Sequence, residues 1–400
     1  MPAPLNRNNR DVRPGRRFWN GHEVDANLRD EWLERLNKLA NFRLTSICEG
    51  HASERRGFGG NPHLILRLME NHNPLMISSW HEIRTALYGK FPCCNADTRY
   101  RVNFELSSDV RLSRGVLQPP VDRFLIRIDS TAHRETNEPE TWFDEFFEQS
   151  VQFAETADSF LREILDKQRI ELIKAGKFVS GAYLKFRYGA DCPAVLVDAV
   201  HAAKPRSDAY TGKIVEAVAK SCSCHAIIST ISRQIADINR PPIEENAGAV
   251  EEYRRTIQHL FESGRLLLSD RTLSRPILHI AVHGMKDSND ADIELGTRMG
   301  SSCSADVLDW VHREIDEWAA STPSLVRKPV LVENRRFIGD ASKQFHRRGG
   351  RRSSYRGYGD FFNTIQIEFA YWLRNEHRAE IVNLLSGLAV KYQAQHEKSR

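Results

Sequence analysis

Residues 192–201 read CPAVLVDAVH, a continuous apolar run that ends on a polar residue. Two later stretches have the same character, HAIISTISR at 225–233 and RPILHIAVHG at 275–284. Continuous apolar runs of this length are typical of strands buried on both faces, as in a parallel sheet. Helical patterns at 211–222 and 249–264 separate them. This alternation predicts an α/β fold, with a mainly parallel mixed sheet covered by helices on both faces.

The same rhythm continues toward the C-terminus. Two more helical patterns and two more strand-like runs follow: helices at 304–321 and 379–395, and strands within 328–337 and 361–373. We therefore place one α/β domain at 177–400. In such sheets the chemistry is expected where the strands end at their carboxyl edge.

The first half of the chain has a different pattern. Its segments predict a basic mobile tail (1–20), a smaller α+β domain of unknown role (21–135) and a helical linker (136–176). Within the α+β domain, strands are predicted at 42–48, 63–69, 100–106 and 123–129, and helices at 25–42 and 73–89.

Composition sets broad limits on function. The 400 residues include 57 Lys and Arg against 53 Asp and Glu, and this net charge of +4 does not indicate a dedicated nucleic-acid binder. No run of about 18 apolar residues is present, so no transmembrane helix is expected. The seven scattered cysteines are no disulfide framework, and we interpret them as buried structural thiols of a cytoplasmic protein.

Polar side chains follow the predicted strands. They are His201 and Asp208 after the first run, Arg233, Asn239 and Arg240 after the second, His283 after the third, and Glu368 inside the last. Two histidines and a carboxylate can hold Zn²⁺ and leave one position for water, and a second carboxylate can take the proton of that water. Each residue alone fits a hydrogen-bonded structural role equally well, but a Glu inside an apolar strand is costly to bury. Strand alternation places Gln366 and Glu368 on one face, as at the edge of a polar site.

Four segments together carry a family resemblance. They are ISRQIADINRPP (231–242), ILHIAVHGMKDSNDADIELGTRMG (277–300), ENRRFIG (333–339) and NTIQIEFA (363–370). In this order they resemble the N-formylglutamate amidohydrolase family, which belongs to the wider zinc carboxypeptidase and aspartoacylase-like fold. The resemblance covers roughly residues 178–395, and nothing before residue 176 belongs to it.

The resemblance implies one Zn²⁺ per chain. His201 resembles the first ligand and His283 the third. Lys204 stands where the carboxypeptidases have the carboxylate of their H-x-x-E pattern, so that pattern is broken here. Asp208 matches the acidic ligand further on, with Glu216 as the weaker alternative.

The resemblance also assigns roles around the metal. Asn239 and Arg240 resemble the pair that grips the substrate carboxylate, with Arg233 as a second anion-binding group. Glu368 resembles the glutamate that activates the metal-bound water. Asp237 is interpreted as orienting an arginine, and DIELGTR (292–298) as a loop that shapes the pocket.

These features predict a zinc-dependent amidohydrolase that cleaves an amide bond near a free carboxylate, in a small anionic N-acyl amino acid or peptide-like substrate. The rival hypothesis is a degenerate hydrolase fold that binds a protein or a nucleic acid. The basic segment 335–356 has two further interpretations besides a solvated loop. It can act as a lid that recruits an acidic substrate or, as the lesser alternative, as a nucleic-acid contact.

Overall fold

The computed structural model describes most of the C-terminal half and selected elements of the N-terminal half. The described residues are 16–19, 22–25, 28–39, 42–48, 63–68, 85, 100–109, 112–113, 116–117, 121–130, 140–190, 192–243, 245–339 and 357–397. The chain divides into two compact units. Unit 1 comprises Met1–Glu70, Ser79–Asp109 and Val121–Lys167, and unit 2 comprises Asn71–Ser78, Val110–Pro120 and Gln168–Arg400.

Unit 1 is built on a four-stranded sheet in the order β3-β4-β8-β5, in which all neighbours are antiparallel. Its strands are β3 (Phe42–Cys48), β4 (His63–Leu68), β5 (Tyr100–Asp109) and β8 (Val121–Ser130). The four strands predicted in this part of the chain are therefore confirmed. A separate antiparallel pair consists of β1 (Arg16–Trp19) and β2 (His22–Asp25). The prediction of a mobile tail up to residue 20 is wrong for Arg16–Trp19, and residues 1–15 lie outside the described part.

Two helices belong to this part of the chain, α1 (Asp30–Asn37) and the long α3 (Glu140–Ala175). Arg35 of α1 donates to both Glu148 and Glu155 of α3 at 2.7–3.0 Å. The predicted helix at 141–176 is thus present, and the boundary between the units falls inside it, after Lys167. The predicted helix at 73–89 lies outside the described residues except for Thr85.

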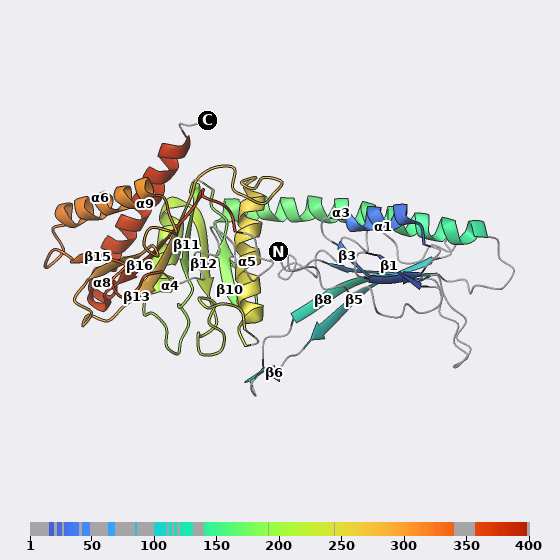
Figure 1. Cartoon of the computed structure of the whole chain (residues 1–400), viewed down its shortest axis with the longest axis horizontal. Helices are drawn as coiled ribbons and strands as arrows, with labels where there is room; N and C mark the ends of the chain where they lie inside the picture. The colour runs from blue at the N-terminus through green and yellow to red at the C-terminus, as the bar shows by residue number, and fades with distance from the viewer. Residues whose placement is uncertain are drawn as a thin grey trace. The chain divides into compact units, whose positions relative to one another are not determined.

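The sheet of unit 2 has eight strands in the order β15-β14-β16-β13-β11-β12-β10-β9 (Figure 1). The strands are β9 (Val179–Ser180), β10 (Leu184–Arg187), β11 (Cys192–Ala199), β12 (Cys224–Ser229), β13 (Ile277–Gly284), β14 (Ile293–Gly296), β15 (Leu331–Glu333) and β16 (Phe362–Phe369). The central run β12-β11-β13-β16 is parallel throughout, because helices connect strands that point the same way. Strands β10 and β14 join it antiparallel, and β9 pairs antiparallel with β10, so the predicted mainly parallel mixed sheet is confirmed. A two-stranded pair, β6 (Leu112–Ser113) with β7 (Val116–Leu117), lies apart from it.

Helices cover both faces of this sheet. They are α4 (Thr211–Cys222), α5 (Ala247–Ser263), α6 (Ala305–Ser321), α8 (Tyr371–Glu376) and α9 (Arg378–Glu397). Helices α4, α6 and α9 pack on one face, in a core that includes Ile365 and Ile367 of β16. Helix α5 covers the other face, where Tyr253 donates to Asp198 and Phe261 contacts Phe362. Alternate residues of the buried strands therefore meet different helices, which explains their continuous apolar pattern.

Two sequence interpretations change in this unit. The segment 292–298 was expected to be a loop, but Ile293–Gly296 form β14, paired with β16. A four-residue strand that follows Asp292 and contains Glu294 gives too short an apolar run to identify by pattern. Of the basic segment 335–356, only Arg335–Gly339 lie within the described residues. Cys222, Cys224 and Cys303 are buried, as expected for structural thiols.

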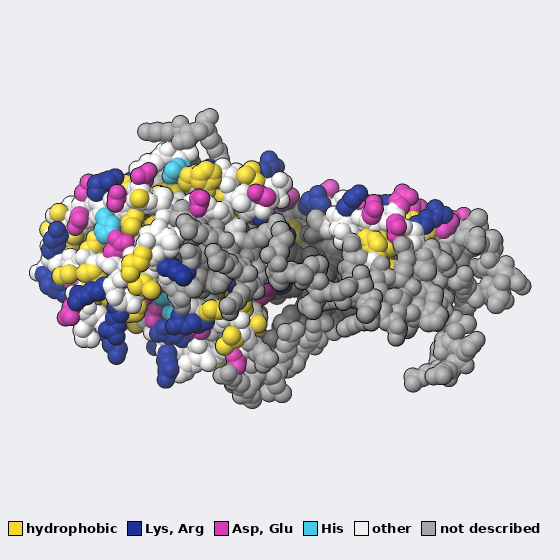
Figure 2. All heavy atoms as spheres, viewed as in Figure 1, with side chains coloured by type: hydrophobic (Ala, Val, Ile, Leu, Met, Phe, Trp, Pro, Cys, Tyr) yellow, Lys and Arg dark blue, Asp and Glu magenta, His cyan; other side chains and the backbone are white. Residues whose placement is uncertain are grey.

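The described surface carries charges of both signs. Figure 2 shows Lys and Arg side chains interspersed with Asp and Glu over the visible part of unit 2, with small apolar groups between them. No helix within the described ranges is long and apolar enough to cross a membrane.

Two buried histidines predict acid sensitivity of unit 2. Burial lowers the pKa of His225 to about 4 and that of His259 to about 3. Both pKa values lie below the unfolded value of about 6.5, so the unfolded state binds more protons as the pH falls. The contribution of these neutral histidines to the free energy of unfolding is therefore fully present above about pH 6.5. It is lost as the pH falls toward 4, and the loss is about 3 kcal/mol for His225 alone.

Urea denaturation at neutral pH and at about pH 5 measures this loss. The control is His225→Asn, because the Asn side-chain oxygen can replace Nδ1, which accepts from the Gly189 N–H at 2.8 Å, without titrating. The variant should lose less stability on acidification than the wild type. Equal losses would show that His225 is not responsible.

Candidate metal centre

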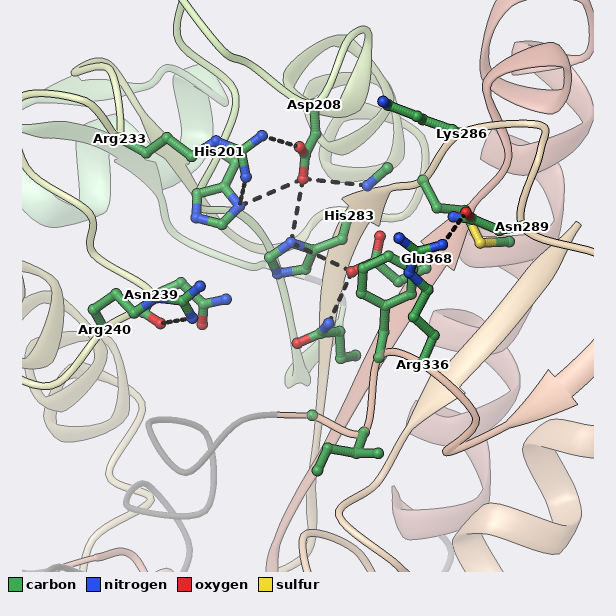
Figure 3. A pocket seen from close by; sticks show the side chains of 16 residues that line it. His201, Asp208, Arg233, Asn239, Arg240, His283, Lys286, Asn289, Arg336 and Glu368 are labelled. Carbon is green, nitrogen blue, oxygen red and sulfur yellow. Dashed lines mark hydrogen bonds and ion pairs between the residues drawn. The ribbon is translucent and has the colours of Figure 1, made fainter. Parts of the chain in front are cut away.

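Three buried side chains from two strand ends meet in one place. His201 follows β11, Asp208 lies just before α4, and His283 is near the end of β13. The Oδ2 atom of Asp208 is 3.4 Å from Nδ1 of His201 and 3.3 Å from Nδ1 of His283. One ligand atom from each residue lies within 4.8 Å of the other two (Figure 3). Two imidazole nitrogens and a carboxylate oxygen at this spacing can hold a metal ion.

The charge balance of this cluster favours a cation. Burial opposes the charged form of Asp208, but the rings of His201 and His283 outweigh it and hold the pKa of Asp208 well below its usual range. Burial also opposes a charged His201, and the carboxylates of Asp208 and Asp237 overcome it, so that the pKa of His201 is raised. Positive charge is therefore favourable between these side chains. A metal ion would compete with protons for the ring nitrogens and the carboxylate.

Asp237 orients the first histidine. Its Oδ1 atom lies 2.9 Å from Nε2 of His201, on the side of the ring away from the cluster. A carboxylate that accepts the Nε2 proton leaves Nδ1 to face a metal, as carboxylate partners of ligating histidines do. Asp237 also accepts from the backbone N–H of Asn239 at 2.9 Å. The arginine contact expected for Asp237 is also present, because Nε of Arg240 lies 3.8 Å from its Oδ2, farther than the 2.9 Å contact to His201.

Glu368 lies beside the cluster on the neighbouring strand. His283 and Glu368 are register partners in the parallel pair β13 and β16, and Nδ1 of His283 is 3.9 Å from Oε1 of Glu368. Gln366 shares the face of Glu368 and donates to its Oε1 at 2.8 Å. The expected alternation is confirmed, because Ile365 and Ile367 point into the core on the opposite face.

The cluster opens into a cavity of about 490 Å³. Arg233 forms one wall: its Nη2 donates to Asp208 Oδ1 at 2.9 Å, and its Nη1 is 3.2 Å from Nδ1 of His201. Asn239 and Arg240 line the same side of the cavity in Figure 3. The Arg240 side chain is 56% exposed, so its guanidinium is accessible to a ligand.

Other polar residues line the opposite side. Lys286, Asn289 and Arg336 lie beyond His283 and Glu368 in Figure 3, and Nη1 of Arg336 donates to Asn289 Oδ1 at 2.6 Å. The buried carboxylate of Glu294 fixes this wall, because it accepts from the backbone N–H groups of Arg336 and Phe337 at 2.5 and 2.6 Å. Four of the lining side chains are basic (Arg233, Arg240, Lys286 and Arg336) and two are acidic (Asp208 and Glu368).

All seven residues selected from the sequence line this one cavity: His201, Asp208, Arg233, Asn239, Arg240, His283 and Glu368. Glu216, the alternative acidic ligand, forms ion pairs instead with Lys185 at 3.1 Å and Lys220 at 2.9 Å. Sequence reasoning did not select Lys286, Asn289 or Arg336 for this site. It also missed Arg374, a buried arginine of α8 that donates to backbone carbonyls beside Asp208, His283 and Glu368. Its signal was a charged residue directly after the apolar run that holds Glu368.

The fold and the site define an α/β protein with a buried His-Asp-His cluster suited to a metal ion. No family model matches the chain, and no curated protein matches it. Among solved structures, the chain is similar to an N-formylglutamate amidohydrolase from Ralstonia eutropha JMP134, at 15% identity and a TM-score of 0.40, covering 55% of this chain and 100% of that one. It is also similar to a metallo-carboxypeptidase from Burkholderia cenocepacia, at 11% identity and a TM-score of 0.33, covering 89% and 96%. A bacteriophage poly-gamma-glutamate hydrolase matches at 10% identity and a TM-score of 0.31, covering 57% and 97%.

Proposed function

We propose that the protein is a zinc-dependent hydrolase that cleaves an amide bond near a free carboxylate. The observation that carries this proposal is the buried His201, Asp208 and His283 cluster, with Glu368 beside it in the same cavity. Two histidines, one carboxylate and an open position are the donor set of catalytic zinc sites. The Asp237 contact to His201 supports the same assignment, because ligating histidines are oriented in this way.

The same donor set also suits ferrous iron in oxygen-activating enzymes. Glu368 favours hydrolysis over that chemistry. Its carboxylate lies 3.9 Å from a ring nitrogen of His283, so it stands beside the proposed metal position, where a general base for the attacking water is needed. Hydrolysis requires such a base, whereas oxygen activation at iron does not.

A bound zinc ion would supply Lewis acidity, which acidifies a water molecule and polarises the carbonyl of the substrate. His201, Asp208 and His283 would hold that ion. Glu368 takes the proton of the attacking water and passes it to the leaving amine. Arg233, adjacent to the cluster, stabilises the negative charge that develops on the carbonyl oxygen.

The cationic walls of the cavity support an anionic substrate. Asn239 and Arg240 dock the free carboxylate, because a guanidinium offers two parallel donors to the two carboxylate oxygens. Lys286 and Arg336 add positive charge on the opposite side of the cluster. An N-acyl amino acid or a short peptide has the required amide bond and carboxylate.

Metal analysis and a substrate screen test the proposal together. The purified full chain should contain about one zinc per chain when zinc is supplied, and it should hydrolyse at least one N-acyl amino acid or short peptide. Bound iron in place of zinc would contradict the hydrolase assignment. Absence of any bound metal under zinc-replete conditions would favour the rival, a binding module with a degenerate hydrolase fold.

Arg240→Ala should weaken binding of the substrate carboxylate. A lost charged hydrogen bond is worth about 1.5–3 kcal/mol, so the KM should rise about 10- to 100-fold. The kcat should change little, because the carboxylate is held equally in the ground state and the transition state. Steady-state kinetics on the best substrate of the screen measures both constants.

The matched control is Arg313→Ala, which removes an exposed arginine of α6 away from the cavity. It should leave both constants unchanged. An unchanged KM in Arg240→Ala would place the carboxylate elsewhere in the cavity.

A further inference from the structure

Arg374 contacts the backbone of the three segments that carry Asp208, His283 and Glu368. It lies in α8, directly after β16, and only 3% of its surface is exposed. Its Nε donates to the carbonyl of Phe369 at 2.9 Å and its Nη2 to the carbonyl of Met285 at 2.9 Å. Its Nη1 donates to the carbonyl of Ala209.

These three acceptors have a common position relative to the site. Phe369 follows Glu368, Ala209 follows Asp208, and Met285 comes two residues after His283. The three segments come from different parts of the chain, and the guanidinium of Arg374 bonds to all of them. A single guanidinium can bind all three because its donors form a rigid planar fork. The one charged group of a lysine has no such geometry.

Burial of this guanidinium is unfavourable in itself. Desolvation lowers the pKa of Arg374, and the carboxylates of Asp208, Glu368 and Asp287 oppose that shift. A buried charge persists only when its hydrogen bonds and neighbouring charges compensate for lost hydration. Here the compensation comes from the three carbonyls and from the acids of the site.

Gly284 provides the space that this contact needs. A Cβ atom at residue 284 would lie 2.4 Å from the guanidinium carbon of Arg374. The Gly284 N–H also donates to Asp208 Oδ2 at 3.2 Å, so the strand end that carries His283 approaches the acidic ligand closely. A side chain at this position would separate Arg374 from the site.

We infer that Arg374 is a positioning residue, which sets the spacing of Asp208, His283 and Glu368 by holding the carbonyls beside them. The expected effect of Arg374 on zinc affinity rests on the proposed function. Arg374 does not touch the ligand atoms of the cluster, so it acts through the three backbone segments. No other described side chain is shown to bond to all three.

The test compares Arg374→Ala with Arg187→Ala in the full chain. Arg187 is also buried and donates to the carbonyl of Ala219 and to the hydroxyl of Ser223, away from the cavity. Both variants lose a buried arginine, so a general loss of stability should appear in both. Only Arg374→Ala should disturb the site.

Hydrogen exchange of the metal-free proteins gives the first readout. In Arg374→Ala, peptides that cover 208–211, 283–286 and 368–371 should all exchange faster than in the wild type. Zinc affinity gives the second, and it should fall about 10- to 100-fold, as for other groups that orient ligands. The absorption spectrum of the Co²⁺-substituted protein should change as well. Millimolar guanidinium, far below denaturing concentrations, should restore affinity by filling the vacated space.

Two outcomes would overturn the inference. One is wild-type zinc affinity together with faster exchange confined to α8 in Arg374→Ala, and the other is the same three-segment effect in Arg187→Ala. If Arg374→Ala does not fold, Arg374→Lys replaces it, because it keeps the charge but not the three-way contact. Its zinc affinity should also fall, and wild-type affinity would contradict the inference. If the wild type itself binds no metal, the proposed function fails, and the exchange data still decide whether Arg374 holds the segments.

Discussion

Glu368→Gln is expected to bind zinc like the wild type and to lose turnover by about 10²- to 10⁴-fold, the usual contribution of a general base. Glutamine has nearly the same shape, but its amide cannot accept a proton from water at neutral pH. The ligand atoms of His201, Asp208 and His283 are untouched by this change. Loss of kcat without loss of metal therefore separates the role of Glu368 from those of the three ligands.

Zinc content, kcat and KM measured on the same preparation check this expectation. Glu376→Gln is the matched control, because Glu376 is an exposed acid of α8 outside the cavity. It should retain full turnover. If Glu368→Gln remains active, another group must deprotonate the water. If it loses zinc, Glu368 holds the metal rather than acting as a base.

Asp208→Asn is expected to lose zinc affinity by more than about 100-fold, beyond the effect of removing an outer partner of a ligand. The carboxylate of Asp208 supplies the negative charge that faces both histidine rings, at 3.4 and 3.3 Å. Asparagine retains an oxygen for the Gly284 N–H but carries no charge. Competition against a chelator measures the affinity of the variant.

Glu216→Gln is the matched control for Asp208→Asn. The resemblance in the sequence left both acids as possible ligands, but Glu216 binds Lys185 and Lys220 at 3.1 and 2.9 Å. The control should therefore keep zinc and full activity. Loss of zinc in Glu216→Gln alone would reverse the assignment of the acidic ligand. Retention of zinc in both variants would exclude Asp208.

Continuous apolar runs were the most reliable structural signal in the sequence. Residues 192–201, 225–233 and 275–284 predicted buried strands, and the structure has β11, β12 and β13 there. Short elements escaped prediction: β14 has four residues, and its pairing with β16 depends on contacts far along the chain. The pattern of a few residues does not carry enough information to distinguish a short strand from a loop.

The sequence alone determined the α/β class and the residues able to bind a metal, because apolar runs must be buried and the polar residues at their ends then share one edge of the sheet. Only the tertiary structure decided how these residues meet. It brought ligand atoms of His201, Asp208 and His283 within 4.8 Å of one another. It also placed Asp237 in hydrogen-bond contact with His201, and Arg374 against the backbone of three separate segments. Such distances depend on strand order and register, which local sequence patterns do not specify.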